Sequence, residues 1–291
     1  MLRREFLRRS VQSIAAAWLA KSATANAAWA ASEPLPDKFT AHDEVVLGHT
    51  GIRTSRLAMG SGTMGFGGAS NQTRIGKAAF VNLLLNGYHE NGLRFFDTAD
   101  AYGSHPEVAA AVRQLPRDKV TIMTKSDNRN PAAMRADLDR FRKELGVDMI
   151  DIVLIHCVTE ADWTTRYRGI MDVLSDAKQK GIIRAHGCSC HTIQALRAAA
   201  ASSWVDLDLV RLNPIGSYMD SNPETVAGVV KEMRAQGKGI VGMKILGQGD
   251  LRDRPAEAVR YALGTGVLDA FTIGAESISQ QNQLVHFVAA A

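Results

Sequence analysis

The sequence predicts an α/β protein of the (β/α)8 barrel class, a single-domain TIM barrel. Eight short apolar runs rich in β-forming residues follow one another between residues 57 and 273. Segments with the 3.6-residue period of an amphipathic helix separate these runs, and alternating strands and helices imply a parallel sheet. The residues that directly follow successive runs lie about 30 positions apart, so that eight strand and helix units fit into about 250 residues, as such a barrel requires.

The N-terminal segment has the composition of a targeting signal. Residues 2–8 read Leu-Arg-Arg-Glu-Phe-Leu-Arg, a mildly apolar stretch covers residues 10–20, and small-residue sites of the A-x-A type follow at 25–27 and 28–30. This order resembles a twin-arginine export signal, which implies that the twin-arginine machinery exports the folded protein to the periplasm or another extracytoplasmic space. The alternative is a basic amphipathic anchor helix. We expect a signal over residues 1–30, a Pro-bearing linker over 31–42 and the barrel over 43–291.

The charge balance separates this segment from the rest of the chain. The whole chain has a net charge of +4, and residues 1–30 hold five basic side chains against one acid, which leaves 29 bases and 29 acids in the remainder. A neutral body lacks the clustered Lys and Arg that bind nucleic acid. No apolar run approaches the ~20 residues of a membrane-spanning helix. We therefore expect neither a nucleic-acid partner nor stable membrane insertion.

The strand and helix units are assigned in chain order from this pattern. The predicted strands cover residues 57–60, 93–96, 120–124, 149–155, 182–188, 207–212, 240–245 and 270–273. The clearest helical segments are residues 132–145, 161–180, 193–202, 223–236 and 255–264. The alternative is an open doubly wound sheet that binds a dinucleotide. It is disfavoured because the glycine-rich stretch at 60–65 matches the G-x-G-x-x-G pattern only loosely, and no strand with an acidic end follows about 20 residues later.

Ionisable residues lie at the ends of three successive predicted strands. Asp97 and Tyr102 belong to Asp-Thr-Ala-Asp-Ala-Tyr-Gly after the second strand, Lys125 ends the third and His156 ends the fourth. In a (β/α)8 barrel the carboxyl ends of the strands converge on the active site. Each of these residues alone is more often structural, as half of an ion pair or a packed core side chain. Together they indicate one shared site.

These four residues, in this spacing, resemble the catalytic tetrad of the aldo/keto reductases, and the likeness runs from about Val45 to about Asn282. The opening Leu-Gly-x-Thr-Gly-x-x-x-Ser-x-Leu at 47–57 also resembles the hairpin with which that family closes the bottom of its barrel. The resemblance implies an NAD(P)-dependent oxidoreductase that transfers a hydride between a nicotinamide and an aldehyde, a ketone or the corresponding alcohol. A small carbonyl compound or a sugar is then the expected substrate.

The chemistry of carbonyl reduction assigns a role to each of the four. Hydride transfer places negative charge on the carbonyl oxygen, so a proton donor is needed there, and we expect Tyr102 to be that donor. A cation beside a phenol lowers its pKa, which predicts that Lys125 lowers the pKa of Tyr102. Asp97 would keep Lys125 charged, and His156 would orient the carbonyl through a ring N–H.

Several cofactor positions depart from the family pattern. Gly62 and Thr63 follow the first strand as expected, but after the fifth strand Ser189 is followed by Cys190 where the family has Asn. On the sixth strand Arg211 replaces a Gln, and a guanidinium donates hydrogen bonds but accepts none. Both changes remove acceptors that hold the nicotinamide carboxamide in the family.

The phosphate and adenine positions differ as well. Lys244 and Gly247 stand where a Ser-Pro-Leu segment meets the pyrophosphate in the family, and Gly274 precedes Glu276 where the NADP-using members carry a basic residue. A carboxylate repels a 2′-phosphate, so we expect a preference for NAD over NADP, unless Glu276 points into solvent or caps the next helix. Asn282 is the expected adenine contact.

The cysteines do not predict a metal site or a disulfide. Cys157, Cys188 and Cys190 all lie near the expected catalytic face. Because side chains alternate along a strand, Cys188 and Cys190 face away from Ser189, and two residues along a strand are ~6.6 Å apart, near the upper limit for a disulfide.

Two other functions are compatible with the four residues at the strand ends: an exported enzyme that acts on a sugar carbonyl without nicotinamide, and a protein that binds a carbonyl ligand without turnover.

Overall fold

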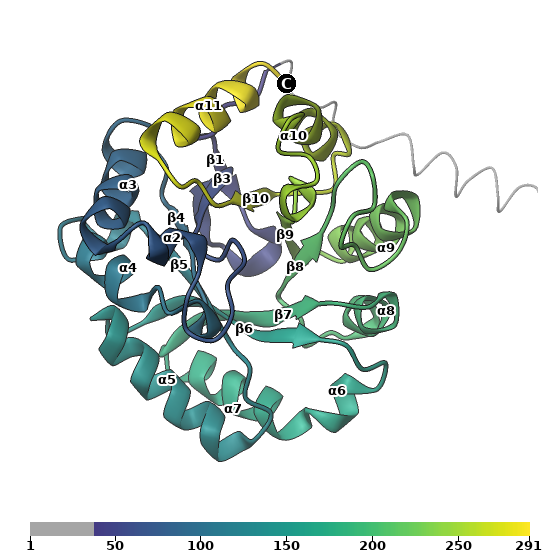
Figure 1. Cartoon of the computed structure of the whole chain (residues 1–291). Helices are drawn as coiled ribbons and strands as arrows, with labels where there is room; N and C mark the ends of the chain where they lie inside the picture. The colour runs from purple at the N-terminus through teal and green to yellow at the C-terminus, as the bar shows by residue number, and fades with distance from the viewer. Residues whose placement is uncertain (1–37) are drawn as a thin grey trace, which may run out of the picture. The chain divides into compact units, whose positions relative to one another are not determined.

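Eight parallel strands close into a barrel in the computed structural model, which describes residues 38–291 (Figure 1). Around the barrel the order is β10, β3, β4, β5, β6, β7, β8 and β9, with each strand parallel to its neighbours. Their bounds are β3 Leu57–Gly60, β4 Phe95–Asp97, β5 Thr121–Ser126, β6 Ile150–Val158, β7 Ile183–Cys190, β8 Leu207–Arg211, β9 Gly239–Met243 and β10 Ala270–Ile273. The predicted (β/α)8 barrel is confirmed, with every strand within a few residues of its predicted place.

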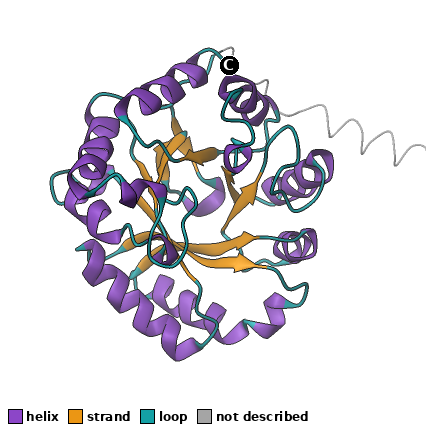
Figure 2. Ribbon diagram, viewed as in Figure 1, coloured by secondary structure: helices purple, strands orange, loops and turns teal. Residues whose placement is uncertain are grey.

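Helices surround the strands on the outside of the barrel (Figure 2). The longer ones are α3 Lys77–His89, α4 His105–Val112, α5 Pro131–Leu145, α7 Arg168–Gln179, α8 Ile193–Ala201, α9 Pro223–Ala235, α10 Pro255–Gly264 and α11 Ile278–Ala289. Short helices are α2 Asn71–Arg74, α6 Trp163–Arg166, η2 Gly48–Thr50, η3 Asp100–Tyr102, η4 Arg117–Lys119 and η5 Gly247–Gly249. In the described part of the chain, none of them combines the length and the apolar character needed to cross a bilayer.

Local sequence explains where these helices begin. Both α5 and α9 start with an Asn-Pro pair, in which the Asn side chain accepts backbone N–H bonds of the first turn and proline occupies the first helical position. Proline suits that position because its missing N–H would have no partner there. The helix predicted over residues 161–180 is in fact two helices, α6 and α7. The backbone of Tyr167 (φ −100°, ψ 16°) departs from helical geometry and separates them.

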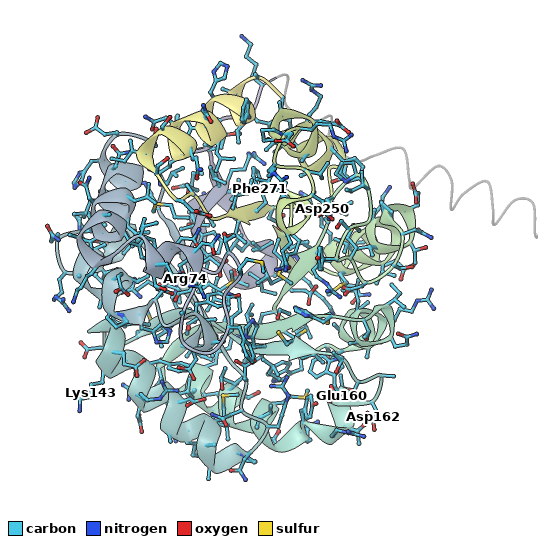
Figure 3. All side chains as sticks on the ribbon, in the orientation of Figure 1. Arg74, Lys143, Glu160, Asp162, Asp250 and Phe271 are labelled. Carbon is cyan, nitrogen blue, oxygen red and sulfur yellow. The ribbon has the colours of Figure 1, made fainter. Side chains whose placement is uncertain are left out.

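Side chains alternate between the two faces of each strand. On β6, Ile152 and Leu154 point into the barrel, whereas Val153 and Ile155 join the outer core beneath the helices. Phe271, buried in the same outer core, lies inside the ring of helices in Figure 3, while the charged side chains of Lys143 and Asp162 lie at the rim. This alternation places every second residue at the carboxyl ends of the strands in the lumen.

The predicted N-terminal hairpin closes the barrel at the amino ends of the strands. Strands β1 (Glu44–Val46) and β2 (Arg53–Ser55) pair antiparallel, and Leu47 and Ile52 between them are fully buried in the inner core. The His49 N–H donates to Gly237 O at 2.7 Å. Gly48 has φ +50°, and a side chain there would overlap the backbone of Gly239. Glycine therefore permits the close approach of the hairpin to β9.

The barrel domain begins earlier than the predicted position 43. Phe39 and Ala41 are buried, the Leu57 N–H donates to Ala41 O at 2.9 Å, and the Arg56 guanidinium lies 4.9 Å from the centre of the Phe39 ring. Apolar burial therefore ties the end of the expected linker to β3. The predicted export signal over residues 1–30 lies outside the described residues.

Candidate active site

The structure brings the four predicted catalytic residues together at the carboxyl ends of the strands. Asp97 ends β4, Lys125 lies on β5 and His156 lies on β6. Their side chains point inward because each occupies an inward position of its strand, in step with the apolar residues of the inner core. Tyr102 ends η3, which follows β4 and folds back over the barrel mouth.

Lys125 is a fully buried lysine that stays charged. Its Nζ donates to Asp97 Oδ1 at 2.5 Å and to Thr98 O at 2.7 Å. Asp97 Oδ2 accepts a hydrogen bond from Thr272 Oγ1 at 2.9 Å. Burial by itself would lower the pKa of Lys125, but the negative charge of Asp97 outweighs it, and the pKa is raised. The pair is therefore an ammonium held by a carboxylate, with its hydrogen bonds satisfied on both sides.

Tyr102 lies between this pair and His156. Lys125 Nζ is 4.8 Å from the centre of the Tyr102 ring, and Tyr102 Oη is 3.4 Å from His156 Nε2. Burial raises the pKa of Tyr102 to about 12, although Lys125 acts in the opposite direction. Lys125 thus lowers the pKa of Tyr102, as expected, but desolvation of the phenolate is the larger effect and the net shift is upward.

His156 is buried and oriented from behind by a carboxylate that the sequence analysis missed. Its Nδ1 lies 3.0 Å from Asp127 Oδ1. Burial lowers the pKa of His156, and Asp127 opposes that shift without reversing it. The imidazole is thus neutral near pH 7, with its Nε2 toward Tyr102. The only sequence signal for Asp127 was its place two residues after Lys125, at the end of β5.

A cavity of about 500 Å³ opens beside Tyr102 and Asp97. Its volume lies in the range of about 300–1,000 Å³ that is usual for small-molecule and cofactor sites. Five of the predicted cofactor residues line it, namely Gly62, Thr63, Lys244, Gly274 and Glu276. Residues that the sequence analysis missed also line it, among them Asn71, Gln248, Arg252, Gln280 and Gln283. These lie in loops, in short helices and on α11, none of which was assigned from the periodic pattern of the sequence.

One end of the cavity carries positive charge. Lys244 has φ +57°, and its Nζ donates to Gln248 Oε1 at 2.7 Å. Burial and the charge of Arg211 lower the pKa of Lys244. Arg252 lines the same cavity from an exposed position, and Gly249 leaves open space beside its backbone. Two cations and an open glycine backbone provide the donors that a phosphate group requires.

The other end of the cavity carries Glu276. Its Oε1 accepts a hydrogen bond from Asn71 Nδ2 at 2.7 Å, and the α11 cap is supplied by Ser277 instead. The fully buried Gln72 connects the segment after β10 to the loop after β3. Its Nε2 donates to Ala275 O at 3.3 Å and to Thr63 Oγ1 at 3.0 Å. The carboxylate of Glu276 is thus held at the cavity wall by α2.

Five other predicted cofactor residues do not line this cavity. Ser189 faces the lumen, but its Oγ accepts the Cys157 N–H at 3.0 Å. Arg211 is bound to Asp220, with Nε 2.9 Å from Asp220 Oδ1. Gly247 is buried behind Gly249 in η5. The side chains of Ser189 and Arg211, which were expected to contact the cofactor, are thus bound by neighbouring groups of the protein itself.

Two of the five point away from the barrel mouth. Cys190 is fully buried in the outer core, on the opposite face of β7 from Ser189. Asn282 accepts a hydrogen bond from Asn91 at 3.0 Å, on the side of α11 that faces the end of α3. Gln283, one position further along α11, lines the cavity instead, because neighbouring residues on a helix point about 100° apart.

The fold and this site define a class of protein: (β/α)8 barrels with a Tyr, Lys, Asp and His acid–base group at the carboxyl ends of the strands. Comparison with family models agrees, since the model of the aldo/keto reductase family matches residues 58–263. The chain belongs to the aldo/keto reductase family.

Curated relatives share part of their length with this chain. The NADH-specific methylglyoxal reductase of Escherichia coli is 27% identical over 169 residues, which cover 50% of this chain and 51% of the relative. An aldo-keto reductase of Mycolicibacterium smegmatis is 30% identical over 57% of this chain and 58% of its own length. The D-threo-aldose 1-dehydrogenase of a Pseudomonas species is 23% identical over 62% and 64%. The chain thus spans about half to two thirds of these relatives.

Solved structures match more of the fold. A putative aldo-keto reductase from Pseudomonas aeruginosa superposes with a TM-score of 0.71 and 24% identity, covering 87% of this chain and 97% of that one. The holo form of an aldo-keto reductase from Bacillus halodurans gives a TM-score of 0.70 with 19% identity, covering 85% and 91%. At these identities the likeness establishes the shared barrel.

Proposed function

We propose that this protein is an NAD(P)H-dependent oxidoreductase that reduces an aldehyde or ketone, or oxidises the corresponding alcohol. The observation that carries the proposal is the contact of Tyr102 with both Lys125 and His156 at the wall of a cavity of cofactor size. A nicotinamide, when bound, supplies the hydride. The protein supplies the proton and the positioning.

The residues that line the cavity fit a dinucleotide. Lys244 and Arg252 offer cations for its phosphates, and Gly249 leaves room for close approach. Gly274 allows this part of the wall to pack closely, because a side chain there would meet Thr63 Oγ1 and the Gln72 amide. Cys190 and Arg211, which replace the family's carboxamide acceptors, do not line this wall, so backbone groups of the wall are the remaining candidates for the carboxamide.

Each catalytic side chain has one task in reduction. Tyr102 remains protonated throughout the neutral range and gives its Oη proton to the carbonyl oxygen as charge develops there. Lys125 stabilises the phenolate that results, and Asp97 keeps the ammonium in place. Neutral His156 carries one ring N–H; with that proton on Nδ1 beside Asp127, its Nε2 accepts from Tyr102 Oη and positions the phenol.

The proposed cofactor preference is NAD. Glu276 and Asn71 form the cavity wall after β10, and a carboxylate there favours ribose hydroxyls over a 2′-phosphate. The name of the Escherichia coli relative, an NADH-specific methylglyoxal reductase, agrees with this preference. That name and the aldose dehydrogenase also suggest small aldehydes and sugars as first substrates to assay.

The test is the loss of absorbance near 340 nm when the purified protein is mixed with NADH or NADPH and an aldehyde panel, with Tyr102→Phe as the comparison. We expect Tyr102→Phe to lower kcat by at least about 100-fold, since a positioned general acid contributes 10²–10⁴-fold, and to change nucleotide affinity only a few-fold. Retention of more than about a tenth of the activity would remove Tyr102 from the donor role. Nucleotide binding without turnover, or product formation without nucleotide, would instead support a binding protein or a nicotinamide-independent sugar enzyme.

We also propose that residues 1–30 direct twin-arginine export. The paired arginines at positions 3 and 4, with Phe6 and Leu7 after them, support this proposal. A fusion of residues 1–42 to a reporter that requires folding before export tests it. Arg3→Lys combined with Arg4→Lys should abolish export while the net charge of the segment is unchanged, and continued export of the double variant would contradict the proposal.

A further inference from the structure

Two cysteines and an aspartate form a fully buried cluster on the outer face of the barrel wall. Cys188 and Cys190 lie two residues apart on β7, and Asp208 is the direct cross-strand partner of Cys188 on β8. The two Sγ atoms are 3.7 Å apart, and Cys188 Sγ is 3.3 Å from Asp208 Oδ1. All three potential ligand atoms lie within 4.8 Å of one another. Two paired strands hold them, so their relative positions are rigid.

The cluster contains more acceptors than its surroundings satisfy. Asp208 Oδ2 is buried and has no hydrogen-bond partner. Asp220, which is buried and close enough to interact electrostatically with Asp208, also has an unpartnered Oδ2, while its Oδ1 is bound by Arg211. A buried carboxylate oxygen without a partner has lost its hydration with no hydrogen bond to replace it, which destabilises the folded protein. A bound cation would remove this cost.

The distances agree with tetrahedral coordination. In a tetrahedral centre with zinc–sulfur bonds of about 2.3 Å and a zinc–oxygen bond of about 2.0 Å, the two sulfurs lie about 3.8 Å apart and sulfur and oxygen about 3.5 Å apart. The observed separations are 3.7 and 3.3 Å. Thiolate and carboxylate together are a donor set that Zn²⁺ takes.

We propose that Cys188, Cys190 and Asp208 bind a divalent cation of the Zn²⁺ type, with Asp220 as the candidate fourth ligand. The site is structural, because its side chains face the outer core and not the lumen. It joins β7 to β8 behind Ser189, and it replaces the sequence-based expectation that the chain binds no metal. A disulfide between the two cysteines would compete with it, but both are free thiols at a separation much longer than a sulfur–sulfur bond.

Two other clusters among the described residues are weaker candidates. His105 already has partners at both ring nitrogens, Glu144 Oε2 at 2.7 Å and Thr124 Oγ1 at 2.8 Å. Asp127, His156 and Cys157 also lie close together, but Asp127 is half exposed and His156 belongs to the catalytic group. Neither cluster combines full burial with an unpartnered carboxylate.

The experiment measures zinc in the full-length protein purified from zinc-supplemented cells. Elemental analysis should find about one zinc per chain, and X-ray absorption at the zinc edge should show two sulfur ligands at about 2.3 Å. Cys188→Ser, Cys190→Ser and Asp208→Asn should each lower the zinc content several-fold. Cys157→Ser is the matched control, because it removes the remaining cysteine, and its zinc content should equal that of the wild type.

The X-ray absorption spectrum of the wild-type protein tests the proposed zinc site even if the variants fail to fold. A zinc shell of nitrogen and oxygen alone would overturn the proposal. Purified protein that holds no zinc, and takes up none when it is refolded with ZnCl2, would also overturn it. An intact protein mass two hydrogens below that of the dithiol form would show a disulfide and would overturn it as well. Loss of zinc in Cys157→Ser alone would place the metal at the catalytic histidine instead.

Discussion

Burial and neighbouring charges shift the pKa values of Lys125 and Tyr102 in opposite directions. The charge has the larger effect at Lys125, whereas burial has the larger effect at Tyr102. Asp97 lies 2.5 Å from Lys125 Nζ and outweighs desolvation, so the lysine remains charged. At Tyr102 desolvation outweighs the opposing charge of Lys125, and the pKa of the phenol is raised to about 12. A phenol with this pKa is a proton donor at every physiological pH.

Removal of the cation should shift the pH dependence of the reaction. In Lys125→Met the phenol loses the charge that partly offsets its burial, so its pKa rises further and the pH optimum should move upward. Alcohol oxidation, which needs the phenolate as base, should fall more steeply than reduction. Profiles of kcat/KM against pH in both directions, with nucleotide affinity as the control, measure this. An unchanged profile would exclude electrostatic coupling of Lys125 to Tyr102.

Reversal of the charge at Glu276 should change cofactor choice. Glu276 lines the cavity, whereas Glu257 lies on α10 outside its lining and pairs with Arg254. Glu276→Lys should raise NADPH affinity by about 10-fold, equivalent to about 1.4 kcal/mol, and Glu257→Lys, with the same change of net charge, should not. Isothermal titration with both nucleotides measures the difference. A wild type that prefers NADPH, or equal effects of the two variants, would show that Glu276 does not set the preference.

At the scale of elements, the loop between β3 and α2 determines the position of the tyrosine. Gly62 and Gly65 lie so close to the Tyr102 ring that a side chain at either position would overlap it. The loop is held in turn by Gln72, which binds Thr63 and Ala275. The Tyr102 ring is therefore positioned by contact with two glycines of the loop that follows β3.

Gly62→Ala should consequently impair catalysis without loss of the fold. The added methyl group displaces the Tyr102 ring, and a displacement of about 1 Å in a reacting group can cost about 100-fold in rate. We expect kcat to fall at least about 10-fold. Gly228→Ala on α9, where an added Cβ meets nothing within 4 Å, is the control and should keep full activity. Equal activity of the two variants would exclude positioning of the ring by Gly62. Melting temperatures separate this effect from instability.

A bulge in β6 gives His156 its orientation. The pairing of β6 with β7 shifts register between Ile155 and Val158, and Cys157 adopts φ +52°. Arg129 donates to the carbonyl oxygens of His156 and Cys157, and Ser189 accepts the Cys157 N–H. Ser189 therefore stabilises the strand end that carries the histidine.

At the scale of the whole molecule, a buried neutral histidine couples stability to pH. Burial lowers the pKa of His105, although Glu144 and Asp100 oppose the shift and Arg140 adds to it. The unfolded chain binds a proton at the ordinary histidine pKa near 6.5, whereas the folded chain resists it. Stability should thus be retained above pH 6.5 and fall below it, by at most about 1.4 kcal/mol per pH unit for this one group.

Urea unfolding between pH 7.5 and 5 tests this prediction. The free energy of unfolding of the wild type should decrease with pH in that interval, and the decrease should be shallower in His105→Gln, which keeps a polar group beside Glu144 and Thr124 but does not titrate. If both proteins lose stability in parallel, the pH dependence arises from other groups.

The fold and the tetrad could be predicted because both depend on regular local patterns. Strand period, helix period and unit length establish the barrel, and its topology then brings strand ends such as Asp97, Lys125 and His156 together whatever the loops do. The site residues on α2 and α11 could not be predicted in this way. Asn71, Gln72 and Gln283 have no period that distinguishes inward from outward, and Asn282 was chosen one position away from the residue that faces the cavity.

The sequence by itself determined the barrel, the acid–base residues and the acidic character of the wall after β10. Only the tertiary structure decided that the pKa of Tyr102 rises, that Arg211 is bound to Asp220, and that Cys188, Cys190 and Asp208 meet. Desolvation and pairing depend on atoms brought close from different strands and loops. The energy of a charge or an unpartnered oxygen therefore depends on neighbours that are distant in sequence. Local sequence patterns do not identify those neighbours.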